Sequence, residues 1–298
     1  TYGEVIWTRS YGGSNIEYAY SACQAIDSGY IIAGKSYSFD GDLTGNNGNS
    51  DMWIFKINDS GDIIWQFNYG GSHNETPGSI IQTGDGGYMI TGSSQSNDGD
   101  VIGHHGASGV RDIWLLKLDQ SGNLVWNKCL GSTGTDDSEQ IISTLDGNFI
   151  LIGDTNGSDG DINFTYGGYD ILILKISPDG ELIWSKNFGG SNADYGLRIK
   201  ELLDGRLAIV SDTQSDDGLV VTNHGLTDLW LFSIDSEGNF LWGKTYGGIG
   251  IETASDLLIM NENQFIVSAS ATLESGAVDL VFGEGDYWIL GINTFGEI

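Results

Sequence analysis

Residues 64–92 read IWQFNYGGSHNETPGSIIQTGDGGYMITG, and the chain repeats this pattern along its length. Similar stretches occupy residues 6–34 (IWTRSYGGSNIEYAYSACQAIDSGYIIAG) and 183–211 (IWSKNFGGSNADYGLRIKELLDGRLAIVS). Aligned on a hydrophobic residue followed by tryptophan, the repeats place Trp7, Trp65, Trp126, Trp184 and Trp242 at intervals of 58, 61, 58 and 58 residues. A fixed period of this length indicates a repeat architecture.

Each period contains four strand-like runs. In the second repeat they are ETPGSIIQT, YMITGSS, DIWLLKLD and LVWNKCLG, joined by the short turns GDGG and QSGN and by one long polar loop. The middle runs are almost continuously apolar, which predicts strands covered on both faces. Four-stranded antiparallel sheets that repeat radially and stack face to face form a β-propeller, with the repeated tryptophans packed between blades.

The two ends of the chain predict the number of blades. The last repeat stops at YWILGINTFGEI, after its third strand, whereas TYGEVIWTRSYGG at the start is a fourth strand without a blade. We therefore predict an all-β, five-bladed propeller, a single domain over residues 1–298, closed by the N-terminal strand. The predicted repeats span residues 7–64, 65–125, 126–183, 184–241 and 242–298, the last completed by residues 1–6. A solenoid with helices is disfavoured because no segment has helical periodicity.

Composition excludes several classes of partner. Among 298 residues, 41 are acidic and 12 are Lys or Arg, giving a formal net charge of -29. Such a surface repels phosphate backbones and anionic lipids, so we expect neither nucleic-acid binding nor direct membrane insertion. Cys23 and Cys129 stand at non-equivalent places in different repeats, and we expect no bridge between them. The chain lacks an initiator Met and a signal-like start, which is typical of a mature form or an excised domain.

The loops divide between two faces. The GDGG and QSGN turns are expected on one face, and the YGGS crossovers and long DGD loops on the other. The second face is the candidate ligand face, because long loops on a rigid scaffold usually carry binding. Its candidate residues are His73, His104, His105, Arg111, His224, Phe39, Phe164, Tyr166 and Tyr169.

A carboxylate follows each repeat tryptophan by ten residues. These acids are Glu17, Glu75, Asp136, Asp194 and Glu252. They are expected at the rim of a central channel, where they would hold a cation or a positively charged group. Alternatively, each acid caps its own crossover by accepting hydrogen bonds from glycine amides, and its identical placement in every repeat favours this role. A second series precedes each third strand and is expected to bind loop amides: Asp51, Asp112, Asp170, Asp228 and Asp286.

The DGD loops predict a possible metal site. Their aspartates are Asp40, Asp42, Asp98, Asp100, Asp159 and Asp161. Carboxylates clustered around a glycine suit Ca²⁺, the one cofactor that the sequence suggests. The full EF-hand spacing is missing, and DG is also ordinary turn chemistry, so a structural role for these loops stays open.

Catalytic motifs are missing from the sequence. It contains no Ser-His-Asp order, Cys-His pairing or HExxH signature, and we expect no enzymatic activity. Two carboxylates from the predicted rim could serve a glycoside hydrolase. A rim that is the same in every blade suits binding or structure better, because a reaction needs distinct groups.

The motifs W-x-K-x-YGGS, DGGY, DGD and DIWxxKLDxxGN recur in register. Through them the chain resembles the secreted tandem-repeat β-propellers of bacterial and archaeal extracellular and surface proteins. The resemblance implies an extracellular or cell-surface location and a non-enzymatic binding or scaffold role towards a protein or glycan. The chain departs from the pattern at CLGSTG in the third repeat and in the fifth repeat, which lacks DGD. A lectin with sugar sites between blades is the first alternative, and a glycoside hydrolase the second.

Overall fold

The computed structural model describes residues 3–261, 264–273, 276–278, 281 and 283–298. Their regular structure consists of β-strands, and no helix in this part of the chain could span a membrane. The chain divides into two compact units, Thr1–Ile141 and Ile142–Ile298. The single domain over residues 1–298 stays a prediction.

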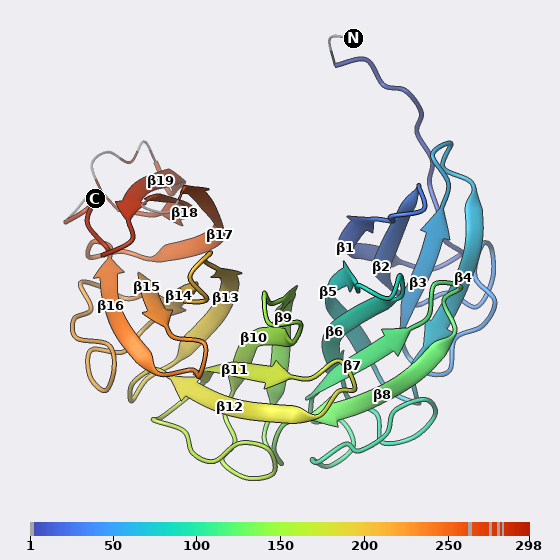
Figure 1. Ribbon diagram of the computed structural model, residues 1–298, viewed down its shortest axis with the longest axis horizontal. Helices are drawn as coiled ribbons and strands as arrows, with labels where there is room; N and C mark the ends of the chain where they lie inside the picture. The colour runs from blue at the N-terminus through green and yellow to red at the C-terminus, as the bar shows by residue number, and fades with distance from the viewer. Residues whose placement is uncertain (1–2, 262–263, 274–275, 279–280, 282) are drawn as a thin grey trace. The chain divides into compact units, whose positions relative to one another are not determined.

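The first unit contains two sheets of four antiparallel strands, each in the order of the chain (Figure 1). The first sheet consists of β1 (Glu17–Gln24), β2 (Tyr30–Ser36), β3 (Asp51–Ile57) and β4 (Ile63–Tyr69). The second consists of β5 (Glu75–Gln82), β6 (Tyr88–Ser94), β7 (Asp112–Leu118) and β8 (Leu124–Leu130).

The remaining strands form three further sheets. The third sheet consists of β9 (Asp136–Ser143), in which the boundary between the units falls, with β10 (Phe149–Thr155), β11 (Asp170–Ile176) and β12 (Leu182–Phe188). The fourth consists of β13 (Asp194–Glu201), β14 (Leu207–Thr213), β15 (Asp228–Ile234) and β16 (Phe240–Tyr246). The fifth has three strands, β17 (Glu252–Asn261), β18 (Gln264–Ala271) and β19 (Asp286–Asn293). These tandem sheets have the strand order of β-propeller blades.

The repeat extends to details of strand pairing. Register shifts interrupt β1–β2 between Ala19 and Ser21, and β5–β6 between Pro77 and Ser79. The same irregularity occurs in β13–β14 and β17–β18. Because a bulge bends its strand and redirects the side chains that follow, its recurrence gives the inner strands the same shape.

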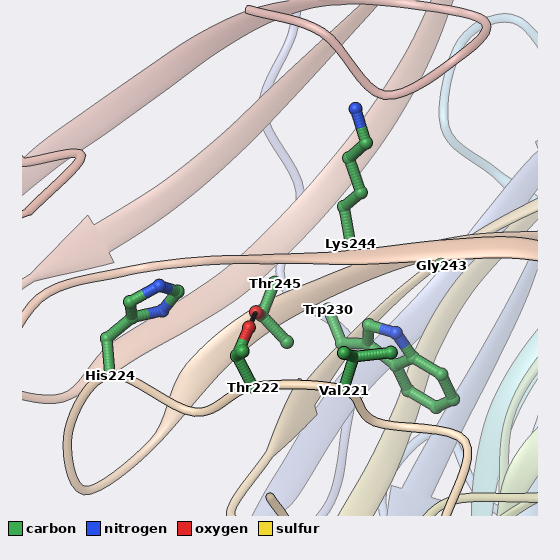
Figure 2. Close-up of a pocket in the computed structure, with 7 residues that line it drawn as sticks. All are labelled: Val221, Thr222, His224, Trp230, Gly243, Lys244 and Thr245. Atoms are coloured by element: carbon green, nitrogen blue, oxygen red, sulfur yellow. Dashed lines mark hydrogen bonds between the residues drawn. The ribbon is translucent and has the colours of Figure 1, made fainter.

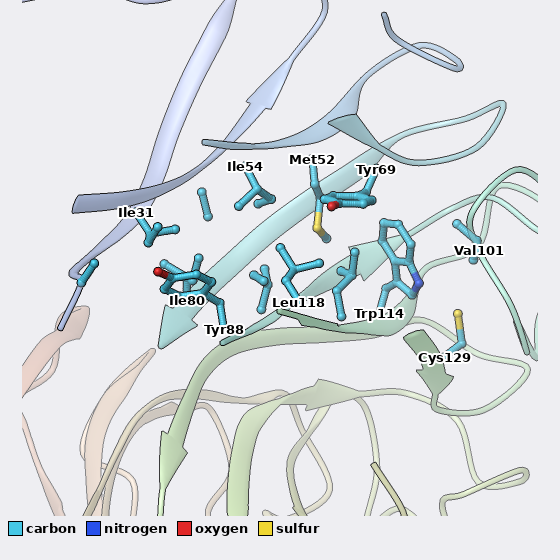
Figure 3. Packing of buried hydrophobic residues seen from close by; sticks show 14 residues of the cluster. Ile31, Met52, Ile54, Tyr69, Ile80, Tyr88, Val101, Trp114, Leu118 and Cys129 are labelled. Atoms are coloured by element: carbon cyan, nitrogen blue, oxygen red, sulfur yellow. The ribbon is translucent and has the colours of Figure 1, made fainter. Parts of the chain in front are cut away.

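Seven of the ten apolar middle strands are buried on both faces, as predicted, whereas β2, β18 and β19 are only partly buried. Every residue of β3, β6, β7, β10, β11, β14 and β15 is buried. Figure 3 shows how this burial arises in the first unit, where Met52 and Ile54 from the first sheet face Tyr88 and Trp114 from the second. Burying such large side chains contributes about 1.5–3 kcal/mol each. Within each unit, the core therefore lies between neighbouring sheets.

The repeated tryptophans pack against the turn of the following sheet. A Cβ on Gly122, in the β7–β8 turn, would lie 2.7 Å from the ring of Trp65, and Gly122 has a φ of 84°. Glycine is required here for two reasons: the turn needs a positive φ, and the indole leaves no room for a side chain. Gly238 and Trp184, and Gly296 and Trp242, repeat the contact in the second unit.

The predicted closing strand is absent from the described residues. Residues 4–13 form no strand, and the fifth sheet ends at β19. Closure of a five-bladed ring therefore stays a prediction. The expectation for the cysteines is confirmed, since both Cys23 and Cys129 are free.

Candidate functional site

The long loops and the crossovers lie at the same end of each sheet and are joined by hydrogen bonds. Asp98 Oδ1 accepts from the Ser72 amide at 2.7 Å, and Asp100 Oδ2 accepts from the Gly70 amide at 3.1 Å. In the first sheet, Asp40 and Asp42 accept in the same way from the amides of Ser14 (2.8 Å) and Gly12 (3.0 Å). The two aspartates of a DGD loop thus clamp two amides of the preceding crossover, which confirms the grouping of these loops at one end.

The clamp gives the DGD aspartates a structural role. Asp159 and Asp161 occupy the equivalent loop of the second unit, where the Asp159 carbonyl accepts from the Ile162 amide at 2.9 Å. Among the described residues, no group of three or more His, Cys, Asp or Glu side chains is arranged to hold a metal ion. Calcium binding stays a prediction.

The carboxylates predicted for the channel rim cap their crossovers. Glu75 is fully buried and accepts from the Gly71 amide (3.0 Å) and from Ser94 Oγ (2.7 Å). The other four acids accept from the amide four residues before them: Gly13 to Glu17 (3.2 Å), Ser132 to Asp136 (2.7 Å), Gly190 to Asp194 (2.8 Å) and Gly248 to Glu252 (2.8 Å). This geometry is the capping role considered from the sequence, and a common channel rim stays a prediction.

The aspartates that open the third strands bind loop amides, as predicted. Asp51 accepts from the Asn47 amide at 2.7 Å and Asp170 from the Tyr166 amide at 2.5 Å. Asp112 and Asp228 accept in the same way from the amides of histidines. Asp286 begins β19 without full burial.

The second oxygen of these aspartates faces another acid. Asp51 Oδ1 is buried and accepts no hydrogen bond within the described residues. A Cβ on Gly70 would lie 2.4 Å from that oxygen and 2.5 Å from Glu75 Oε2, so the two carboxyl groups meet across the glycine. Gly247 stands in the same way between Asp228 and Glu252.

Burial shifts the protonation of these acids. Burial raises the pKa of Asp51 to about 7. The hydrogen bond from the Asn47 amide lowers this pKa in part, and the negative charge of Glu75 raises it by a smaller amount. Burial raises the pKa of Asp170 to about 6, where Asp194 adds a like charge. Two facing carboxyl groups that lack solvent resist carrying two charges, and this repulsion adds to the increase in pKa.

The structure encloses one of the predicted histidines. The His104 side chain is 1% exposed, and its ring nitrogens lie 3.2 Å from the Gly106 carbonyl and 3.1 Å from the Val110 carbonyl. His105 Nδ1 lies 2.9 Å from Asp112 Oδ2. The two residues therefore organise their own loop. Arg111 lies on the surface, 3.1 Å from Asp137, and His73 is within 3.0 Å of Ser72 Oγ.

The predicted aromatic residues form two separate groups. Phe164, 49% exposed, meets Tyr166 edge to face with ring centroids 5.1 Å apart. Tyr169 contacts Tyr195 at 5.7 Å. Phe39 lies in a loop of the other unit and is also exposed. Phe164 and Tyr166 thus form a small exposed apolar area in the second unit, whereas Tyr169 is half-buried against Tyr195.

The sequence analysis missed a set of buried lysines at the opposite end of the sheets. Lys117 Nζ binds Asp85 at 2.9 Å and Thr83 Oγ1 at 2.9 Å. Lys56 with Asp27, and Lys175 with Asp146, repeat the ion pair. A lysine inside the apolar runs MWIFKI, DIWLLKL and ILILKI was the available signal. These pairs hold the first turn of a sheet to its third strand.

A pocket of about 300 Å³ opens beside the long loop of the fourth sheet. Its lining comprises Val221, Thr222, His224, Trp230, Gly243, Lys244 and Thr245 (Figure 2). The sequence analysis had singled out His224 alone. The missed signal is Gly243, which stands where β4 and β8 carry Gln66 and Asn127 after their tryptophans.

Comparisons with known proteins give distant similarities. No protein-family model matches the chain. The regulatory protein FlaEY of Caulobacter vibrioides is 26% identical over 199 residues, which make up 61% of this chain and 20% of that protein. The chain thus matches about a fifth of the length of that relative.

Solved structures similar to the chain come from several functional classes. A levansucrase from B. megaterium has a TM-score of 0.43 and 9% identity, covering 97% of this chain and 86% of the other. A mannose phosphorylase from Leishmania mexicana has a TM-score of 0.44 and 10% identity over 85% and 80% of the two chains. Drosophila plexin A in complex with semaphorin 1b has a TM-score of 0.47 and 10% identity over 96% and 55%. At these values the similarities assign no function.

The buried acids predict an unusual dependence of stability on pH. The folded-state pKa is about 7 for Asp51 and Asp212 and about 6 for Asp170, above the value of about 3.9 for an unfolded aspartate. Because these pKa values are raised, the stabilisation is complete below about pH 4 and is lost as the pH rises through 6 to 7. We expect the urea midpoint to fall between pH 5 and pH 8.

Two variants separate this effect from the general repulsion of a charge of -29. Asp51→Asn retains an acceptor for the Asn47 amide but cannot ionise, so the fall in urea midpoint should be smaller. Asp85→Asn is the control, because the pKa of Asp85 is lowered to about 2 and this group does not titrate in that range. An Asp51→Asn variant with the wild-type slope would contradict the interpretation.

Proposed function

We propose that the chain is a non-enzymatic binding or scaffold module that presents the long-loop end of its sheets to a partner. The observation that supports this most directly is the use of the repeated acids within the fold. Glu75, Asp98 and Asp100 all accept from crossover amides, and Glu17, Asp40 and Asp42 do the same in the first sheet. Loops held in this way form a rigid surface, on which exposed side chains that differ between repeats would select the partner.

The same observation disfavours the glycoside hydrolase. Such an enzyme needs two carboxyl groups that face its substrate from opposite sides of the scissile bond. Glu75 and Asp136 are fully buried and already accept hydrogen bonds from their crossovers. The lectin alternative has more support, because Phe164 and Tyr166 offer exposed aromatic surface for a sugar face.

The partner that we propose is a protein or glycan outside the cell or at its surface. The location rests on the resemblance of the repeats to secreted and surface propellers. The charge of -29 supports the exclusion of nucleic acid and of anionic membranes, since like charges repel at long range.

Binding to glycan and cell-surface protein arrays tests the module. We expect the wild-type protein to bind a defined subset of the arrayed glycans or proteins. The double variant Phe164→Ser, Tyr166→Ser should reduce that binding about fivefold or more, because it removes exposed apolar contact area. Leu203→Ser is the matched control, because Leu203 is exposed in a short turn of the same unit. Empty arrays would contradict the proposal. Hydrolysis of a polysaccharide that Glu75→Gln abolishes would establish the enzyme instead.

We also infer that the N-terminal segment completes the fifth sheet. Trp7 Nε1 donates to the Asp59 carbonyl at 2.8 Å, and Tyr11 OH to the Gly61 carbonyl at 2.6 Å. Tyr246, in the fourth strand of its sheet, donates in the same way to the Gly296 carbonyl of the following turn, at 2.7 Å. This likeness of the contacts supports a position for the segment equivalent to that of a fourth strand.

Exposed apolar residues support this closure. Ile6 is 93% exposed and Tyr287, on the last strand β19, is 97% exposed. Large apolar side chains and an open strand edge are costly to leave uncovered. Pairing residues 4–10 with β19 would cover both.

Amide hydrogen exchange tests the closure. We expect the amides of residues 5–10 to be protected to the level of β16, because strand pairing removes them from water. Deleting residues 1–10 should raise exchange in β19 and lower the melting temperature, whereas deleting residues 1–3 should change neither. Exchange of residues 5–10 at the rate of an unfolded peptide would contradict closure.

Calcium stabilisation of the DGD loops is the remaining element of the proposal. If Ca²⁺ binds there, millimolar Ca²⁺ should raise the melting temperature of the wild type, and Asp40→Asn with Asp98→Asn should reduce the increase. Mg²⁺ at equal concentration controls for general screening of the acidic surface. An unchanged melting temperature with Ca²⁺ would remove the metal and leave the amide clamp as the function of these loops.

A further inference from the structure

The pocket of the fourth sheet exists because one side chain is missing. In the first sheet, Trp53 Nε1 donates to Gln66 Oε1 at 2.7 Å, and in the second Trp114 Nε1 donates to Asn127 Oδ1 at 3.1 Å. The equivalent position of β16 is Gly243, which provides no acceptor.

The indole of Trp230 is left with an unused donor. Trp230 is 1% exposed and lines the pocket, and its Nε1 is not among the buried polar atoms that lack a partner within the described residues, so this nitrogen borders open space and not a sealed interior. A Cβ on Gly243 would lie 2.7 Å from this nitrogen. The indole thus approaches Gly243 more closely than a residue with a side chain would allow, and both residues line the pocket. A ligand oxygen in the pocket would replace the acceptor that the amide side chain supplies in the other sheets.

A buried carboxylate orients the histidine of the pocket. Asp228, fully buried, accepts from the His224 amide at 2.8 Å and lies 2.6 Å from His224 Nδ1. A carboxylate accepts hydrogen bonds, so Nδ1 carries the proton and Nε2 remains for another partner. The side chain of His224 is 44% exposed, so this nitrogen is accessible from solvent.

Two hydroxyl groups lie between the histidine and the tryptophan. Figure 2 shows Thr222 and Thr245 with their hydroxyl oxygens directed towards each other, 2.9 Å apart. Each hydroxyl can donate or accept. Val221 also lines the pocket and adds an apolar side chain to it.

The charge of the lining narrows the class of ligand. Lys244 is the one lysine or arginine in the lining, and its side chain extends away from the other six residues (Figure 2). No carboxylate lines the pocket. The groups that remain are an indole N–H, two hydroxyls, an imidazole and an apolar surface, which suit a neutral ring that bears several hydroxyl groups.

We propose that this pocket binds a single sugar ring, with a ring hydroxyl accepting from Trp230 Nε1 and others bound by Thr222, Thr245 and His224 Nε2. A volume of about 300 Å³ holds one ring and is at the lower end for ligand pockets. The inference rests on the proposed binding function and gives it a specific location, distinct from the aromatic residues of the third sheet.

Titration with methyl glycosides of common hexoses and N-acetylhexosamines tests the site. The readout is the indole N–H resonance of Trp230 in ¹⁵N-labelled protein, assigned by its loss in Trp230→Phe. We expect at least one glycoside to shift this resonance with a millimolar dissociation constant. Thr222→Val, which keeps the side-chain shape, should weaken binding about tenfold, as loss of a hydrogen bond would. Gly243→Asn, which introduces the residue found in β8, should abolish it.

Lys244→Gln distinguishes a neutral ligand from an anionic one. A neutral sugar should bind this variant with the same affinity as it binds the wild type. A tenfold loss of affinity, or binding of methyl glucuronide alone, would show an anion site and overturn the proposal. Shifts at other tryptophans without Trp230 would place a sugar elsewhere, which refutes this site but leaves the binding module intact. If no glycoside shifts the Trp230 resonance, the proposed sugar site is also wrong. The array experiment would then test the proposed binding function independently of this site.

Discussion

The hydrogen bond from a crossover amide to a carboxylate is the contact on which the long-loop end of the protein depends. A crossover of the YGGS type exposes several amides in a few residues, and no strand is available to pair with them. Glu75 binds the Gly71 amide from one side, and Asp98 and Asp100 bind Ser72 and Gly70 from the other. Buried amides that lack partners are costly, so the acids determine whether this path of the chain is stable.

This arrangement explains part of the acidic composition and creates a conflict. Acids brought together to satisfy amides also approach each other, as Asp51 and Glu75 do on either side of Gly70. Desolvation and like charge oppose ionisation of both groups, which raises the pKa of Asp51. Glycine is essential at this point because even a methyl group would displace one of the carboxyl groups.

Sequence alone was sufficient to predict the fold of each repeat. The tryptophan spacing and the apolar runs predicted four strands per period, and strands such as β7 are buried throughout as expected. The structure also shows that the acids ten residues after each repeat tryptophan cap their crossovers. Capping depends on whether a carboxylate oxygen faces an amide, and the spacing of residues in the sequence does not reveal this. Lys117 was missed because a lysine in an apolar strand is normally expected at the surface, and its partner Asp85 lies 32 residues away. The enclosure of His104 was equally unpredictable, since it depends on the path of a loop with three extra residues.

The repeats also show how a specific site can arise in a uniform scaffold. A side chain that recurs in every sheet is explained by what every sheet needs, and it provides little basis for choosing one ligand. Specificity requires a difference between sheets. At Gly243 the difference is the absence of a side chain, while β15 and β16 pair with the same register shift as β3–β4 and β7–β8. In the first and second sheets Gln66 and Asn127 accept from the equivalent indole nitrogen. In the fourth sheet Gly243 offers no such acceptor, so the Trp230 donor beside the pocket is available to a polar ligand.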